Sequence, residues 1–243
     1  MKAGKLHSFW IILMSSLYMA STCGLAIWKS LRGTITREWC SEELQRWAKR
    51  MLHLLRIHCK VINPHHVTPQ KGKATILMCN HTSLLDIPIS LQAFPNLPIR
   101  MLAKKELSRI PIMGGGMLAA EFPFIDRKNR HQAINDLAKV KALLESGIVM
   151  WIAPEGTRST NGTLGVFKKG GFITAIKTGA TIIPIIIKGA NQILPARSKQ
   201  FQLDQKAEIH IGKPIDAAHY DLEHKEQLME KVFREMHDLL HHN

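Results

Sequence analysis

Tyrosine, paired cysteines and metal-binding signatures are scarce or missing in this sequence of 243 residues. Its four cysteines form no C-x-x-C pair, so neither a zinc site nor a disulfide framework is indicated, and free thiols fit a reducing compartment. The 13 histidines include no H-E-x-x-H motif, so no metal is expected. Only two tyrosines are present and aromatic residues do not alternate with basic ones, which argues against a nucleic-acid partner.

Loops that hold nucleotides or activate a serine are also missing. The chain has no Walker A loop and no G-x-S-x-G elbow. Residues 114–119 fit the pattern G-x-G-x-x-A, but residues 109–112 before them make a poor strand, which argues against dinucleotide binding. Without a serine elbow, direct attack by a substrate hydroxyl is a simpler expectation than a route through an acyl-enzyme.

Positive charge is what the chain has in excess. Lysine and arginine total 33 against 19 acidic residues, a net charge of +14, which suggests an anionic partner such as lipid headgroups or a phosphorylated substrate. The length suits one α/β domain with appendages, and 45% of the residues are hydrophobic, which is enough for a sizeable core.

The longest uncharged stretch lies near the N-terminus, at residues 6–28. A helix of this length spans about 34 Å, slightly more than the hydrocarbon core of a bilayer. Trp10 and Trp28 lie near its ends, as interfacial aromatics do, and the basic residues that follow it favour a body on the cytoplasmic side of an inner membrane. A cleaved signal peptide is disfavoured because residues 20–23 make a poor exit site, while a buried core helix is the other alternative. We expect a membrane anchor that either spans the bilayer or enters one leaflet.

Residues 38–60 show a second helical pattern, with an apolar stripe and a basic remainder. Such a helix either lies on an anionic membrane or packs its stripe on the domain, and one helix can do both. Asn63 and Pro64 stop the pattern. We therefore predict membrane-anchoring helices over residues 1–60 and a catalytic domain over residues 61–243.

The rest of the chain alternates short apolar strands with helices. This alternation predicts an α/β fold with a mostly parallel central sheet flanked by helices. The expected strands are residues 74–79, 99–103, 122–125, 148–153, 181–187 and 208–211, and the expected helices cover 134–147, 172–177 and a final segment after Asp221.

A histidine and an acid sit at the end of the first of these strands, within residues 80–86. His81 and Asp86 are about 140° apart on a regular helix, so they meet only if His81 lies in the loop before the helix starts. Thr82 or Ser83 is then a natural N-cap. A histidine accepts protons near neutral pH, and a carboxylate on its other nitrogen orients it, so the pair fits a general base. The alternative is a histidine satisfied in a turn and an aspartate stabilised by the helix dipole.

Charged and glycine-containing clusters follow other expected strands. Because strand ends in a parallel sheet converge on one edge, these groups are expected to surround His81, where arginine suits a phosphate. The clusters are Lys104 and Lys105, Asp126 and Arg127, residues 154–159, and residues 167–171.

These motifs, in this order, make the chain resemble the glycerolipid acyltransferase family, specifically the 1-acylglycerol-3-phosphate (lysophosphatidic acid) acyltransferases. Residues 80–86 match the N-H-x-[ST]-x-x-D block, and residues 124–127 match the block that ends in an acid and arginine. Residues 154–159 match P-E-G-T-R-S in full, and residues 182–185 match an aliphatic-proline run. Two departures, at Ala153 and at residues 121–123, affect pocket shape rather than the base.

The resemblance implies acyl transfer from acyl-carrier protein or coenzyme A to the 2-hydroxyl of lysophosphatidic acid, giving phosphatidic acid at an anionic membrane without a cofactor or metal. His81 is the implied base and Asp86 orients it, while backbone amides near the helix start stabilise the oxyanion. The substrate-binding residues that it implies are Asn80, Ser83, Lys104, Lys105, Arg127, Glu155, Gly156, Thr157 and Arg158.

Two other functions remain open on sequence grounds. One is a related acyltransferase that uses glycerol phosphate or another lysolipid as acceptor. The other is a membrane-surface or lipid-carrier protein in which the histidine motif is structural and no reaction occurs.

Overall fold

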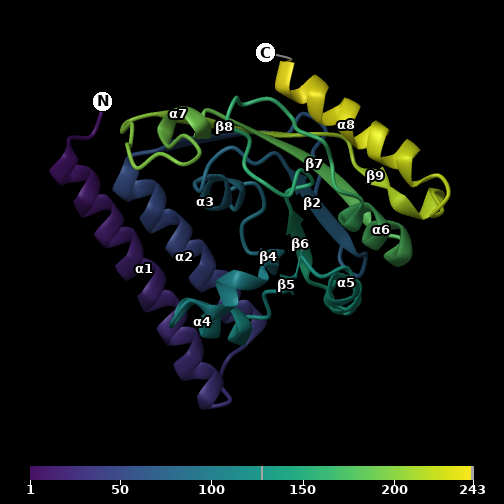
Figure 1. Cartoon of the computed structure of the whole chain (residues 1–243), viewed down its shortest axis with the longest axis horizontal. Coiled ribbons are helices and arrows are strands. Elements are labelled where there is room, and N and C mark those ends of the chain that lie inside the picture. The colour runs from purple at the N-terminus through teal and green to yellow at the C-terminus, as the bar shows by residue number, and fades with distance from the viewer. Residues whose placement is uncertain (127, 242–243) are drawn as a thin grey trace.

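Seven strands form one sheet in the computed structural model, which describes residues 1–126 and 128–241 (Figure 1). The strand order is β1-β8-β7-β2-β6-β3, and β9 pairs with β7. Neighbours are parallel except where β7 meets β8 and β9, so the predicted mostly parallel sheet is confirmed. The strands are β1 His58–Ile62, β2 Thr75–Cys79, β3 Ile99–Met101, β6 Val149–Ile152, β7 Thr181–Lys188, β8 Lys206–Ile211 and β9 Ile215–Asp216.

The sheet is buried on both faces because its central strands are apolar at nearly every position. Alternate side chains of β2 point to opposite sides: Leu77 and Cys79 join one apolar cluster, while Ile76 and Met78 join the other. The first cluster packs on α2 Arg37–Leu55, α3 Asp86–Ser90 and α7 Ala190–Ile193. The second packs on α5 Arg130–Glu145, α6 Lys169–Thr178 and α8 Lys225–His241.

The N-terminal apolar segment forms α1 Lys5–Leu31, which runs along the outside of α2 (Figure 1). Near its end it meets α4 Met113–Ala119, which follows the short helix η1 Lys105–Arg109. The glycines of the G-x-G-x-x-A pattern explain this contact, because a Cβ added at Gly116 would lie 2.3 Å from Cys23 Cβ. These glycines therefore permit close helix packing rather than an approach to a nucleotide.

Two sequence expectations about the helices and strands were wrong in extent. The helix expected over residues 38–60 ends at Leu55, because Arg56 turns left-handed at φ 52° and the chain enters β1. The apolar stripe of α2, including Trp47 and Leu55, is buried in the core, so it packs on the domain. The strand expected over residues 99–103 is broken after Met101, and β4 Ala103–Lys104 pairs instead with β5 Phe124–Ile125. The division at residue 60 stays a prediction.

Candidate active site

His81 lies in the loop that follows β2, and its ring contacts the side chain of Asp86. Its Nδ1 is 2.9 Å from Asp86 Oδ2. This is the geometry that the sequence required, with the histidine before the helix and the acid as the first residue of α3. No hydrogen bond joins Nε2 to a group within residues 1–126 and 128–241, and His81 is part of the lining of a cavity.

Asp86 is fully buried, and its carboxylate collects several hydrogen-bond donors. Oδ2 accepts the backbone N–H groups of Thr82 at 2.6 Å and of Ser83 at 2.8 Å, in addition to its contact with His81. The carboxylate therefore fixes the ring orientation and favours a proton on Nδ1, which leaves Nε2 as an acceptor.

The same contacts correct one expectation about the start of α3. Neither Thr82 nor Ser83 is the N-cap, because the helix begins at Asp86 and Leu85 precedes it without a side-chain cap. The amides of Thr82 and Ser83 donate to Asp86, and the oxyanion role expected of backbone amides near the helix start stays a prediction. A loop side chain was expected to accept N–H groups of the helix. Instead, the side chain of Asp86, the first residue of the helix, accepts N–H groups of the loop.

Glu155 joins the loop after β6 to the histidine loop. Its buried carboxylate accepts the backbone N–H of His81 at 3.2 Å and that of Gly165 at 2.7 Å. In the opposite direction, the N–H of Ser159 donates to the carbonyl oxygen of His81 at 2.7 Å. Burial raises the pKa of the Glu155 carboxyl above its ordinary value of 4.5, and the two amides lower it only in part. The cluster at residues 154–159 thus supports the backbone of the histidine loop.

The raised pKa of Glu155 predicts a pH-dependent term in stability. Between pH 4.5 and the folded pKa, the folded protein binds more protons at this site than the unfolded chain does. The free energy of unfolding should therefore fall as pH rises through that window. We expect Glu155→Gln, which cannot titrate, to remove this fall. Urea unfolding of both proteins at a series of pH values measures it, and parallel pH profiles would contradict the assignment.

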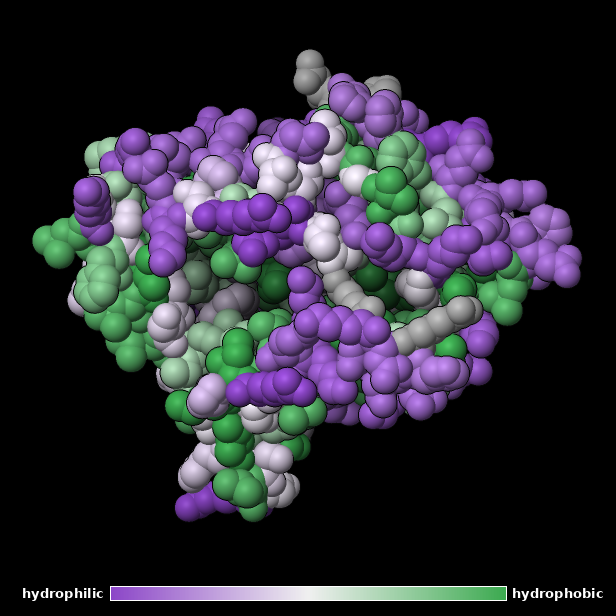
Figure 2. All heavy atoms as spheres, viewed as in Figure 1, coloured by the Kyte–Doolittle hydropathy of each residue, from purple (hydrophilic) through white to green (hydrophobic). Residues whose placement is uncertain are grey.

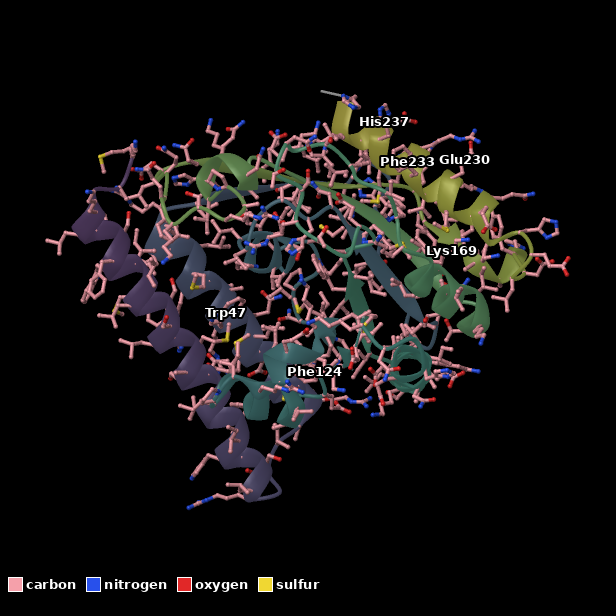
Figure 3. The ribbon with its side chains drawn as sticks, viewed as in Figure 1. Trp47, Phe124, Lys169, Glu230, Phe233 and His237 are labelled. Atoms are coloured by element: carbon pink, nitrogen blue, oxygen red, sulfur yellow. The ribbon has the colours of Figure 1, made fainter. Side chains whose placement is uncertain are left out.

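A cavity of about 390 Å³ opens beside the His81 ring. Its wall is mostly apolar and is built from α1, α2, α4 and the ends of β3 and β6. Trp151 of β6 packs edge-on against His81, with ring centroids 5.9 Å apart. Trp47 of α2 (Figure 3) also lines the cavity. An apolar wall with one histidine and few charges suits a lipid chain better than a polar ligand.

Four of the predicted binding residues line this cavity: Lys104, Gly156, Thr157 and Arg158. They follow β3 and β6, whose carboxyl ends lie at the same edge of the sheet as that of β2. Gly156 has φ 74°, which a residue with a side chain rarely adopts, so the glycine allows the sharp turn there. Arg127 lies outside the described residues.

The other predicted binding residues are engaged within the protein. The side-chain amide of Asn80 exchanges two hydrogen bonds with the backbone of Ile187, at 2.8 and 3.1 Å. The buried hydroxyl of Ser83 donates to the carbonyl of Leu194 at 2.7 Å. The ammonium group of Lys105 pairs with Asp126 at 3.0 Å. Asn80 and Ser83 thus tie the histidine loop to β7 and to the segment after α7.

No residue of the basic cluster at residues 167–171 is part of the cavity lining. Phe167 is buried against Phe233 of α8, with ring centroids 5.3 Å apart, and Lys169 pairs with Glu226 of the same helix at 3.0 Å (Figure 3). The backbone N–H of Lys168 nevertheless donates to the carbonyl of Pro154 at 2.7 Å, so the cluster adjoins the loop after β6. Its Phe167 and Lys169 side chains turn to α8 instead of the cavity.

Sequence reasoning missed the cavity wall supplied by the N-terminal helices. Thr22 and Cys23 of α1 and Leu44 and Trp47 of α2 line the cavity. Thr22 also donates to Glu43 of α2 at 3.1 Å, which ties the two helices together. The apolar stripe of α2 was visible in the sequence, but periodicity alone does not tell a stripe that packs on the core from one that faces a ligand.

One departure in the second block has a structural account. Glu121 has φ 62°, in the left-handed region where glycine is favoured. Its carboxylate forms a two-pronged ion pair with Arg37 of α2, with both N–O distances 2.7 Å. This pair fastens the segment before β5 to α2.

Comparisons with known proteins agree with this arrangement. Residues 58–188 match the family model described as Acyltransferase. The chain is 31% identical over 154 residues to the chloroplastic 1-acyl-sn-glycerol-3-phosphate acyltransferase of Arabidopsis thaliana, covering 63% of this chain and 43% of that protein. It is 28% identical over 175 residues to 1-acyl-sn-glycerol-3-phosphate acyltransferase alpha of Mus musculus, covering 68% and 60% of the two chains. The matches thus span about half the length of these curated relatives.

A solved structure shares the fold. The crystal structure of the 1-acyl-sn-glycerophosphate (LPA) acyltransferase PlsC from Thermotoga maritima superposes with a TM-score of 0.76 at 24% sequence identity. The superposition covers 98% of this chain and 96% of that chain. The N-terminal helices are therefore part of the shared architecture.

Proposed function

This chain belongs to the acyltransferase family, and from that premise we propose that it transfers a fatty acyl group from a thioester to the 2-hydroxyl of lysophosphatidic acid. The observation that carries the proposal is a histidine, paired with a buried carboxylate, on the wall of an apolar cavity. The names of the relatives in two organisms point to the same acceptor. The product is phosphatidic acid, and the donor is acyl-carrier protein or acyl-coenzyme A.

The proposed reaction passes one proton through His81. Nε2 takes the proton of the 2-hydroxyl while the oxygen attacks the thioester carbonyl carbon. Asp86 stabilises the imidazolium that forms. When the carbon–sulfur bond breaks, the thiolate leaves and the imidazolium returns the proton to it. The acyl group thereby passes from the thiol sulfur to the 2-oxygen, and the thiol is released, without a covalent enzyme intermediate.

Lys104 and Arg158 are the proposed contacts for the acceptor phosphate. Both line the cavity that His81 lines, and both side chains are cationic. A guanidinium presents a planar fork of donors that matches phosphate oxygens, so Arg158 is the stronger candidate for orientation. Arg127, which the family pattern also assigns to the phosphate, is kept as a proposal from its position in the sequence.

The acceptor assignment is tested by comparing two lysolipids that differ in the phosphate. We expect the full chain to acylate lysophosphatidic acid faster than a phosphate-free monoacylglycerol, since only the former meets the cationic side chains. Arg158→Ala should raise the KM for lysophosphatidic acid and leave the rate on the phosphate-free acceptor nearly unchanged. A preference for the phosphate-free acceptor would reject lysophosphatidic acid and favour a relative with another lysolipid.

We also propose that α1 seats the protein on one leaflet of the cytoplasmic membrane. It is the one helix in the described residues that is long and apolar enough to cross a bilayer, and 17% of its apolar window is buried. Its N-terminal end is nevertheless fastened to the catalytic body, because Leu203 N–H donates to Met1 and Ala3 N–H donates to Phe201. A helix tied to one body at both ends does not cross. Protease sites added at the two chain ends should be cut from the same side of sealed vesicles.

A further inference from the structure

A second exposed apolar surface lies in the segment between β4 and β5, at residues 109–118. The segment has two sides, and its inner side lines the cavity through Met113, Gly116 and Met117. Its outer side exposes Ile110, Ile112 and Leu118 to solvent. The cavity wall at this point is therefore one short helix thick, with apolar side chains on both surfaces.

Ile112 is held in a strained backbone conformation at the tip of this segment. It has φ 64° and ψ −54°, and the N–H of Met113 donates to the carbonyl of Pro111 at 2.7 Å, which makes a γ-turn of the strained type. A positive φ is a true outlier for a β-branched residue. The turn leaves the side chain 52% exposed. Glycine would form the turn with less strain. In water, isoleucine at this position is therefore unfavourable both for its backbone conformation and for its exposed apolar side chain.

This surface is continuous with the exposed face of α1. The two helices touch where Gly115 and Gly116 of α4 meet Ile27 and Cys23 of α1. At the same end, α1 exposes Leu25, Trp28 and Leu31. Figure 1 places α4 beside this half of α1, and Figure 2 shows apolar residues continuing down the edge of the molecule where α1 lies.

The charges around this joint surface favour a lipid rather than a protein partner. α1 contains no acidic residue, and Lys29 and Arg32 follow its apolar face at the end near α4. Arg109, which is exposed, stands at the start of the second surface. Apolar side chains bordered by basic ones are the pattern that binds an anionic bilayer surface.

We propose that residues 109–118 insert into the same leaflet as α1 and form a second membrane contact. The proposal rests on the membrane seat assigned to α1 and extends it to a segment far away in the sequence. A single helix lying on a membrane leaves rotation about its axis unspecified, whereas two adjoining contacts fix it. Fixing that rotation holds the wall of the cavity against the leaflet that supplies lysolipid.

Vesicle binding of an aspartate variant tests the second contact. The full chain carrying Ile112→Asp and Leu118→Asp should partition at least about tenfold more weakly to vesicles of phosphatidylcholine and phosphatidylglycerol. The control is Ile134→Asp on α5, since Ile134 is 56% exposed and Ile112 is 52% exposed. It should bind as the unaltered chain does. Binding of the double variant equal to that of the control would overturn the proposal.

A probe measurement keeps the test independent of how well the aspartate variants fold. In a Cys59→Ser background, Ile112→Cys and Ile134→Cys are each labelled with a fluorophore and mixed with vesicles whose acyl chains carry a quencher. We expect quenching at position 112 and none at position 134. Equal quenching at both positions would overturn the proposal. So would a dimer of the unaltered chain that forms without vesicles and that Ile112→Asp dissociates, because the surface would then serve self-association. Neither readout uses a thioester or an acceptor, so failure here is separate from failure of the acylation assay.

Discussion

Replacing His81 by alanine is expected to lower turnover by about 10²–10⁴-fold while membrane binding is kept. The ring is the proton acceptor of the proposed reaction, and alanine supplies no other group at that place. The loss should appear mainly in kcat, because the substituted side chain is one wall element of a cavity that many other residues line. Initial rates of thiol release with lysophosphatidic acid measure it.

The chain offers a matched control for this substitution. His210 is also nearly buried and also contacts a carboxylate, with its Nε2 2.9 Å from Glu208, but it lies on β8 outside the cavity lining. His210→Ala should therefore alter stability without a comparable effect on turnover. Unchanged turnover in His81→Ala would reject catalysis by this histidine. It would favour a lipid-binding protein in which the motif is structural.

Asp86→Asn is expected to reduce turnover by at least about 10²-fold and to destabilise the fold as well. The backbone N–H groups of Thr82 and Ser83 need an acceptor at the Oδ2 position, so the asparagine oxygen takes that place and still faces His81 Nδ1. What the variant loses is the negative charge that stabilises the imidazolium formed during proton transfer. Losing the charged acceptor of several hydrogen bonds also costs about 1.5–3 kcal/mol of unfolding free energy.

Stability and chemistry are separated by a second control. Asp136 on α5 is nearly buried and accepts the backbone N–H of Asp126 at 2.9 Å, but it does not line the cavity. Asp136→Asn should therefore reproduce part of the destabilisation in urea unfolding and leave turnover per folded molecule close to that of the unaltered chain. If both variants lose turnover in proportion to folded fraction, the orienting role of Asp86 is wrong.

Local patterns predicted most of the sheet and the central pair of residues. β2 and β7 were visible as continuous apolar runs, and the five-residue separation of His81 from Asp86 required the loop-to-helix step that is found. These features depend on residues that are close in sequence. The same reasoning placed Gly156 and Arg158 near the histidine, because parallel strands end on one edge.

Features that depend on contacts between distant segments were not predictable in the same way. The sequence did not reveal that Asn80 bonds to the backbone of β7 or that Lys105 pairs with Asp126. From sequence alone, a bound substrate was an equally plausible partner for each of these side chains. It also did not reveal the walls that α1 and α2 contribute. An apolar stripe predicts burial, but the partner that buries it is set by the three-dimensional packing.

A double-variant cycle tests most directly whether His81 and Asp86 act as one unit in proton transfer. Turnover is measured for the unaltered chain, for each single variant, and for the protein carrying His81→Ala and Asp86→Asn together. Once the ring is gone, the carboxylate has nothing to orient, so the account predicts that the double variant is no slower than His81→Ala alone. Losses that multiply across the two positions would contradict it, because they would show that each side chain acts separately.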